Sequence, residues 1–222
     1  MCGRFSFATE WEEVLREFLI PTSQYTDRPR YNVAPGQLIT AIIFGHGERR
    51  IGPLKWGLIP HFSKDASVGY KMINARAETL EDKPSYRKLL DRKRCLIPAD
   101  GYYEWKREAG KTTPYRIVLR DRPLFAMAGL YDTCINIEGE KISSCTIVTT
   151  AASEWMATIH ERMPVILTKE AEEAWLSADD FQYVKQLLRP YDAEKMRAYP
   201  VSPLVGNVKN DSTLCISEAT IP

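Results

Sequence analysis

Apolar residues recur at helical spacing near the start of the chain. Five of them within residues 9–20 share one face of a helix with 3.6 residues per turn: Trp11, Val14, Leu15, Phe18 and Leu19. Thr9 stands where an N-cap residue is expected, and Pro21 ends the helical pattern. The segment is therefore predicted to form an amphipathic helix that turns this face toward the core.

Most of the chain after this helix has patterns typical of short strands. Apolar or alternating runs are separated by clusters of Gly, Pro, Asp and Lys, and they cover residues 38–44, 53–60, 71–78, 94–106, 114–120, 123–132, 144–150 and 163–168. Helical periodicity returns at residues 85–93, 153–159, 168–176 and 179–188. Strands and helices do not alternate regularly, and no repeat or linker divides the chain. We expect an α+β fold, a single domain over residues 1–222, with a curved, barrel-like, mostly antiparallel β core and peripheral helices.

Composition narrows the class of protein. The 222 residues are 44% hydrophobic, which is enough apolar material for a proper core. The chain has 30 basic and 29 acidic residues, so no overall basic excess indicates a nucleic-acid binder, and any anion site must be local. The longest apolar stretches are too short to span a bilayer and the N-terminus has no signal pattern, so we expect a cytoplasmic protein without a membrane partner.

The cysteines do not form a recognisable framework. They are odd in number and contain no C-x-x-C pair, which argues against disulfides and zinc: Cys2, Cys95, Cys134, Cys145 and Cys215. The sequence predicts no metal site and no cofactor. Cys95, Cys134 and Cys145 lie in apolar runs and are predicted to be buried thiols. Cys2 differs, because removal of Met1 would leave its amine and its thiol on adjacent carbons.

Several polar residues are not explained by the core pattern. Strand alternation in MINARAE places Asn74, Arg76 and Glu78 on one face. These residues either face solvent or recognise an anionic or sugar-like ligand, because an amide donates and accepts hydrogen bonds and arginine binds phosphate with two donors. In ADGYYEWK, Glu104 lies between two aromatic residues. If its side chain faces a cleft, burial would raise its pKa, whereas if it faces water it is an ordinary surface charge.

The histidine of TIHERMP is one of only three in the chain. An unperturbed histidine has a pKa of about 6.5, which suits His160 for acid-base chemistry. The alternative interpretation is that His160 only packs or forms hydrogen bonds within the protein. Lys209, in the turn-rich C-terminal stretch, and Arg4, behind Cys2, are further candidates for contact with an anion.

Seven collinear motifs together resemble one family. They are MCGRF, YNVAPG, WGLIP, INARAE, PADGYYEWK, TIHERMPVIL and GNVKN, and their order and spacing are similar to those of the SRAP family, the SOS response-associated peptidase proteins, also described as abasic-site processing proteins. The resemblance spans nearly the whole chain.

The resemblance implies a specific function. It implies that Met1 is removed and that Cys2 captures the ring-opened aldehyde of an abasic site in single-stranded DNA as a stable thiazolidine, protecting the lesion in the DNA damage (SOS) response. Asn74 and Glu104 would position the open sugar, and His160 would be the acid-base residue. The DNA-facing surface would include Arg76, Trp105 and Arg162, to which the residues' own chemistry adds Arg4 and Lys209.

The chemistry of an N-terminal cysteine agrees with that role. A terminal amine has a pKa of about 7.7 to 8, so a neutral fraction can attack an aldehyde, and the thiol can then close a five-membered ring. An abasic-site imine could also lead to strand cleavage, which would be a lyase activity. The same groups suit a cysteine peptidase or amidase of the N-terminal-nucleophile kind, for which self-removal of Met1 would be peptidase chemistry. A non-catalytic single-strand-binding module is the third hypothesis. We expect a monomer that associates with the nucleoid when it acts on DNA.

Overall fold

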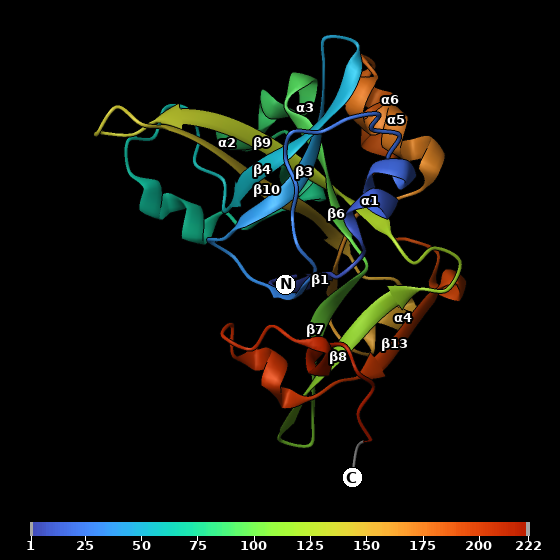
Figure 1. Cartoon of the computed structure of the whole chain (residues 1–222). Helices are drawn as coiled ribbons and strands as arrows, with labels where there is room; N and C mark the ends of the chain where they lie inside the picture. The colour runs from blue at the N-terminus through green and yellow to red at the C-terminus, as the bar shows by residue number, and fades with distance from the viewer. Residues whose placement is uncertain (1, 221–222) are drawn as a thin grey trace.

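Five strands close into a ring. They lie at the centre of the molecule (Figure 1). The computed structural model describes residues 2–220. The strands are β3 (Leu38–Gly45), β4 (Glu48–Trp56), β6 (Arg94–Ala99), β9 (Phe125–Ile135) and β10 (Lys141–Ala151). They are ordered β10-β4-β3-β6-β9, and β9 pairs again with β10, so the sheet closes on itself. Only the β4–β10 pair of this ring is parallel. The predicted barrel-like, mostly antiparallel core is confirmed; closure removes free edges from these strands.

Short strands extend the barrel. Two of them lie along β10, one parallel and one antiparallel, and a third pairs with β9: β5 (Asn74–Arg76), β11 (Arg162–Pro164) and β12 (Ile166–Leu167). The predicted strands over residues 71–78 and 163–168 are therefore present but shorter, and the second is split in two. The predicted strand over residues 53–60 was placed too late, because β4 ends at Trp56.

A second, antiparallel sheet lies below the barrel in Figure 1. Its strands, in spatial order, are β13 (Met196–Pro200), β8 (Lys111–Leu119), β7 (Gly101–Glu108), β1 (Phe5–Phe7) and β2 (Arg30–Val33). The single strand predicted for residues 94–106 is wrong, since the chain turns at Asp100 and β6 and β7 belong to different sheets. The Asp100 carboxylate accepts hydrogen bonds from the Ser6 hydroxyl at 2.6 Å and from Arg116 Nη2 at 2.8 Å, which stabilises this corner.

The helices are short and lie around the sheets, as predicted. They are α1 (Trp11–Glu17), α2 (Pro84–Arg87), α3 (Leu89–Arg92), α4 (Glu154–Ala157), α5 (Lys169–Ser177) and α6 (Phe181–Gln186), with 3-10 turns η1 (Ala66–Lys71), η2 (Ala77–Thr79), η3 (Ala193–Lys195), η4 (Pro203–Gly206) and η5 (Thr213–Cys215). The Ser153 and Thr168 side chains cap the N-termini of α4 and α5. Across the described residues, every helix is too short or too polar to cross a membrane.

The first helix differs from its prediction at both ends. Its N-cap is Glu10, without a side-chain cap, because the Thr9 hydroxyl lies instead 3.4 Å from an Asp100 carboxylate oxygen. Val14 and Phe18 are fully buried as predicted. Leu19 was wrongly placed on the buried face: it is 75% exposed and has φ 55°, because the helix has already ended before it.

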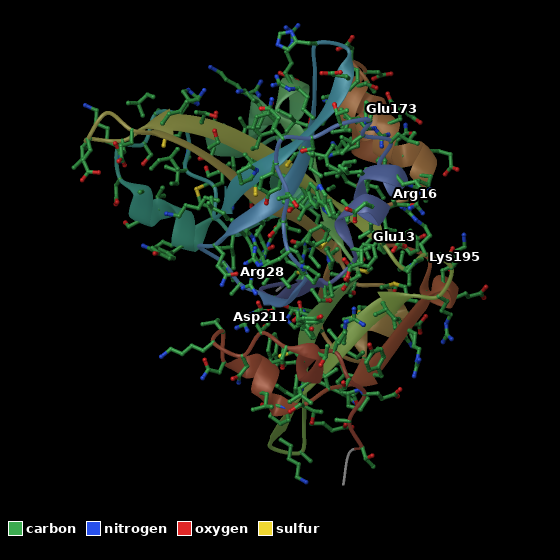
Figure 2. The ribbon with its side chains drawn as sticks, viewed as in Figure 1. Glu13, Arg16, Arg28, Glu173, Lys195 and Asp211 are labelled. Atoms are coloured by element: carbon green, nitrogen blue, oxygen red, sulfur yellow. The ribbon has the colours of Figure 1, made fainter. Side chains whose placement is uncertain are left out.

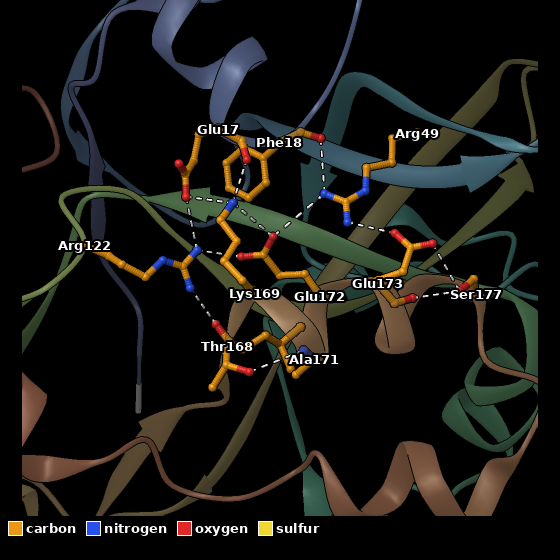
Figure 3. A network of polar contacts seen from close by, with 11 residues as sticks. Glu17, Phe18, Arg49, Arg122, Thr168, Lys169, Ala171, Glu172, Glu173 and Ser177 are labelled. Carbon is orange, nitrogen blue, oxygen red and sulfur yellow. Dashed lines mark hydrogen bonds and ion pairs between the residues drawn. The ribbon is translucent and has the colours of Figure 1, made fainter.

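A buried carboxylate joins α5 to the elements beside it (Figure 3). The Glu172 side chain has no exposed surface, and Arg122 Nη2 lies 2.6 Å from its Oε1. Lys169 Nζ and Arg49 Nη1 lie 3.5 and 3.8 Å from its Oε2. Lys169 also pairs with Glu17 at the end of α1, at 2.7 Å. Burial raises the pKa of Glu172, and the three cations around the carboxylate offset part of this effect. The network joins α1 and α5 to the barrel strand β4.

Cys95, Cys134 and Cys145 are buried thiols, as predicted, and all three lie on barrel strands. No disulfide joins cysteines in the described part of the chain.

A close approach of two backbone segments explains a glycine of the WGLIP motif. Gly57 has φ 130°, and a Cβ there would lie 2.7 Å from the carbonyl oxygen of Gly69. We expect Gly57→Ala to lower the free energy of unfolding by about 2–4 kcal/mol, because strain and overlap with backbone add together. Gly52→Ala is the control, since nothing lies within 4 Å of its Cβ position on β4. Urea denaturation measures both, and equal midpoints for the two variants would contradict the argument.

Candidate functional site

The residue after the initiator methionine lies between the two sheets. The Cys2 side chain is fully buried, and its carbonyl oxygen accepts a 2.9 Å hydrogen bond from Asn74 Nδ2 on β5. Two residues later, the Arg4 carbonyl accepts a 2.9 Å hydrogen bond from the Tyr103 N–H on β7. The N-terminal segment is thus held from the barrel side and from the second sheet at once.

A carboxylate and an imidazole face each other beside this segment. Glu104 lies on β7 and His160 follows α4; Glu104 Oε2 and His160 Nε2 are 3.9 Å apart. Only 3% of the Glu104 side chain is exposed, and this burial raises its pKa to about 7. Burial lowers the pKa of His160, so the imidazole is neutral at neutral pH. Glu104 is therefore present in both protonation states near neutrality, which suits a group that gives and takes protons.

The backbone of Arg162 holds one edge of the His160 ring. The Arg162 N–H lies 3.0 Å from His160 Nδ1, and the Arg162 carbonyl oxygen lies 3.2 Å from the same nitrogen. Nδ1 accepts from the N–H in one tautomer and donates to the carbonyl in the other. In both cases these contacts leave Nε2 on the side of Glu104.

The environment of Cys2 keeps its thiol protonated. Burial raises the pKa of the Cys2 thiol well above its usual range, and the charge of Glu104 raises it further, while the Arg4 backbone N–H acts in the opposite direction. A thiol of this kind needs a base to become a nucleophile. Glu104 is near enough for its charge to act on the sulfur.

A cleft of about 670 Å³ opens over Glu104 and His160. Its walls come from the β7–β8 hairpin on one side and from residues 157–161 on the other; the lining residues include Trp105, Arg107, Thr112, Thr158 and Glu161. Cys2 does not line this cleft. Glu104 connects the two places, because it lines the cleft and also acts on the Cys2 sulfur.

The predicted polar face of MINARAE is divided in two. Ala75 is buried against the barrel, Asn74 donates to Cys2, and Arg76 is exposed on β5. The interpretation of this face as plain solvent surface is therefore wrong for Asn74, whereas Arg76 remains open to a ligand.

Two predicted DNA-binding arginines are engaged in contacts within the protein. Arg4 Nη1 donates to Asn32 Oδ1 at 2.8 Å and to the Val205 carbonyl at 2.6 Å, and its guanidinium lies over the Trp105 ring at 5.9 Å. Arg162 forms two parallel hydrogen bonds to the Glu78 carboxylate, at 2.8 and 3.0 Å.

The C-terminal segment is joined to the start of the chain by a residue that the sequence analysis missed. Asn32 is 2% exposed, and its Nδ2 donates to the carbonyls of Val205, Asn207 and Asn210. Asp211 accepts from the backbone N–H of Tyr31 at 2.6 Å and pairs with Arg28 at 3.5 Å (Figure 2). The feature of the sequence that could have indicated this residue is the single amide side chain in the largely apolar motif YNVAPG. These contacts present Lys209, which is exposed, on the surface of that segment.

The described residues include no group of three or more His, Cys, Asp or Glu side chains that could hold a metal ion. The acid-base pair beside Cys2 is the chemistry that this site offers.

Comparison with known proteins identifies relatives that are named abasic site processing proteins. The chain is 51% identical over 219 residues to the abasic site processing protein YoqW of Bacillus subtilis (strain 168), covering 96% of this chain and 97% of that protein. It is 34% identical to the abasic site processing protein HMCES of Gallus gallus, covering 85% of this chain and 66% of that protein. A crystal structure of a Bacteroides thetaiotaomicron protein superposes with a TM-score of 0.90 at 30% identity, covering 99% of this chain and all of that one. The model of the SOS response associated peptidase (SRAP) family matches residues 1–208, and the chain belongs to this family.

Proposed function

We propose that this protein processes abasic sites in single-stranded DNA by joining Cys2 to the ring-opened sugar as a thiazolidine. The observation that carries the proposal is the convergence of Cys2, Asn74, Glu104 and His160 from four separate segments. The names of the related proteins support abasic-site processing. Met1 lies outside the described residues, so its removal is part of the proposal.

The amine of Cys2 acts first. Its nitrogen attacks the C1′ aldehyde carbon, and the resulting carbinolamine loses its hydroxyl as water when a proton is supplied, which leaves an imine. Protonated Glu104 is the proposed donor, because a pKa of about 7 keeps much of it protonated near neutrality. Asn74, through the Cys2 carbonyl, holds the N-terminal residue in place for this attack.

The thiol of Cys2 acts second. The ionised form of Glu104 takes the proton of the thiol, the sulfur adds to the imine carbon, and the imine nitrogen gains that same proton from Glu104, directly or relayed through the imidazole of His160. The net change is aldehyde plus aminothiol giving thiazolidine plus one water. No oxidant or reductant is needed. Without the sulfur the imine remains, and strand cleavage by β-elimination is then open as a lyase reaction.

Two exposed cations and one aromatic ring support a single strand as the ligand. Arg76 is exposed beside Asn74, Lys209 is exposed on the C-terminal segment, and Trp105 offers a half-buried ring at the cleft. Arginine and lysine bind phosphates, and aromatic rings stack with unpaired bases. We propose that the protein acts as a cytoplasmic monomer on such DNA in the SOS response, associated with the nucleoid.

The whole chain is proposed to form one SRAP domain over residues 1–222. The segment after residue 208 belongs to it because Cys215 is buried and Glu218 forms an isolated bridge with Val201.

A direct assay tests the function. The purified protein, with loss of Met1 verified by intact mass, is incubated with a single-stranded oligonucleotide that carries one abasic site. We expect a band that resists heat and denaturant, and none with the undamaged oligonucleotide. Absence of the band with Met1-free protein would overturn the proposal. Turnover of an acyl substrate that a thiol alkylator blocks would instead favour the N-terminal-nucleophile peptidase.

The Arg162–Glu78 pair gives a separate prediction for DNA affinity. A phosphate must compete with the Glu78 carboxylate for the same two guanidinium nitrogens. Glu78→Gln removes the competing charge, so we expect undamaged single-stranded DNA to bind about 2- to 5-fold more tightly at low salt, by fluorescence anisotropy. Glu81→Gln, which removes an equal charge from a surface pair with Lys185, is the control. Equal affinities for the two variants would show that Arg162 does not bind phosphate.

A further inference from the structure

The cleft has one permanent cation that the proposed chemistry does not use. Among the described residues that line it, Glu104 and Glu161 are acids, His160 is neutral at neutral pH, and Arg107 alone carries a fixed positive charge. Arg107 is exposed near the free end of the β7–β8 hairpin. Among the described side chains that line the cleft, Arg107 is therefore the one that can attract an anion through a permanent charge.

Register gives Arg107 a second donor beside it. Arg107 on β7 is directly opposite Thr112 on β8, and directly opposed residues of an antiparallel pair extend to the same side of the sheet. Thr112 also lines the cleft and is exposed. A guanidinium and a hydroxyl side by side match the oxygens of a phosphate.

The arginines proposed to contact DNA are distributed over both sheets. Arg76 and Arg162 lie on β5 and β11, which both pair with the barrel strand β10, whereas Arg107 lies on β7 of the second sheet. The cleft with Glu104 and His160 has one wall from each side. Arg107 thus belongs to the cleft wall of the second sheet, whereas Arg76 and Arg162 belong to strands on the barrel side.

We propose that Arg107, with Thr112, binds a backbone phosphate flanking the abasic sugar, on the opposite side from Arg76 and Arg162. This proposal rests on the proposed function for its ligand, single-stranded DNA. Arg107 would anchor the strand at the cleft, with no part in proton transfer or in positioning the sugar for the reaction.

The neighbouring lysine provides a matched control. Lys106 is adjacent in sequence and has the same charge, but it does not line the cleft and its Nζ lies 2.7 Å from Glu108 Oε2. Both side chains belong to the outer part of a hairpin, so Arg107→Ala and Lys106→Ala should both fold, which equal thermal midpoints will verify.

The test is equilibrium binding of an undamaged single-stranded oligonucleotide over a series of salt concentrations. Loss of one phosphate contact should reduce the slope of log affinity against log salt by about 0.7. We expect Arg107→Ala to show this reduction and to bind about 3- to 10-fold more weakly at low salt, Arg107→Lys to keep the slope, and Lys106→Ala to match the wild type. An unchanged slope for Arg107→Ala, or an equal effect of Lys106→Ala, would overturn the proposal.

A second measurement separates this site from the reaction. With abasic DNA, Arg107→Ala should form the adduct more slowly at low DNA concentration and reach the wild-type rate at saturation, because Arg107 contributes to binding only. If the wild type forms no adduct while Arg107→Ala still reduces the salt slope, the phosphate site stands and the proposed reaction fails. A lower rate at saturation would instead make Arg107 part of the reaction and contradict its role as an anchor.

Discussion

Cys2→Ala is expected to abolish the adduct that resists heat and denaturant, while single-stranded DNA still binds. The variant keeps the N-terminal amine and loses the sulfur, so the reaction stops at an imine that water can reverse. The measurement is the cross-linked band on a denaturing gel after incubation with an abasic oligonucleotide. Cys134→Ala is the control, because it removes a buried thiol from β9 and leaves the site unchanged.

A chemical trap makes this expectation sharper. Borohydride reduces an imine to a stable amine, so Cys2→Ala should give a covalent band only when the reductant is present, whereas the wild type should give one without it. Loss of Met1 from the variant is verified by intact mass, since an acylated amine forms no imine. A band from Cys2→Ala without the reductant would contradict thiazolidine formation.

The parts of the fold that local pattern determines were predictable. The barrel strands β3, β9 and β10 contain apolar runs, and α5 follows a threonine cap, so these elements were predicted from the sequence alone. The barrel strand β4, which is only partly apolar, was predicted too late in the chain. The division between β6 and β7 was missed, because the apolar and aromatic residues on both sides of Asp100 were interpreted as one strand. It depends on Asp100 contacting Ser6 and Arg116, which are distant in sequence.

The candidate site likewise depends on contacts between residues that are distant in sequence. Residue type and neighbours indicated Asn74, Glu104 and His160, but whether they meet Cys2 depends on the packing of the two sheets. Arg4 and Arg162 were predicted to face DNA, and each has a partner within the protein that no local pattern indicates: Asn32 for Arg4, and Glu78 for Arg162. The charge of a side chain can be taken directly from the sequence, whereas a partner that is distant in the chain becomes known only from the folded structure.

Burial of Cys2 and Glu104 places reactivity and stability in opposition. A buried thiol and a buried carboxyl lose the water that favours their charged forms. For Glu104 this produces a pKa near neutrality, which is useful for proton transfer, at a cost to the folded state whenever the carboxyl is ionised. Exposure of Glu104 would relieve that cost and would also restore an ordinary acidic pKa. The site therefore depends on the two sheets remaining packed against each other.

Glu104→Gln is accordingly expected to lower activity and raise stability. The amide cannot transfer a proton, so the rate of adduct formation should fall roughly 100-fold or more, and the inflection of the rate near pH 7 should disappear. The folded-state pKa of about 7 lies above the unfolded value, so the folded protein binds the proton more tightly. The wild type thus loses stability as pH rises from about 4.3 to about 7, and the loss is complete above that window.

The amide of the Glu104→Gln variant does not ionise, so its stability lacks this dependence on pH. Relative to the wild type, Glu104→Gln should gain up to about 3 kcal/mol of unfolding free energy at pH 8 and little at pH 4, measured by urea denaturation at both pH values. Glu161→Gln is the matched control, because Glu161 lines the same cleft but is exposed, and it should leave both rate and stability near wild type. A variant that loses activity and also unfolds more easily at pH 8 would identify Glu104 as a structural residue. The opposite signs of the two effects are what a proton-transfer role requires, because the burial that destabilises the ionised carboxyl is also what makes it a donor at neutral pH.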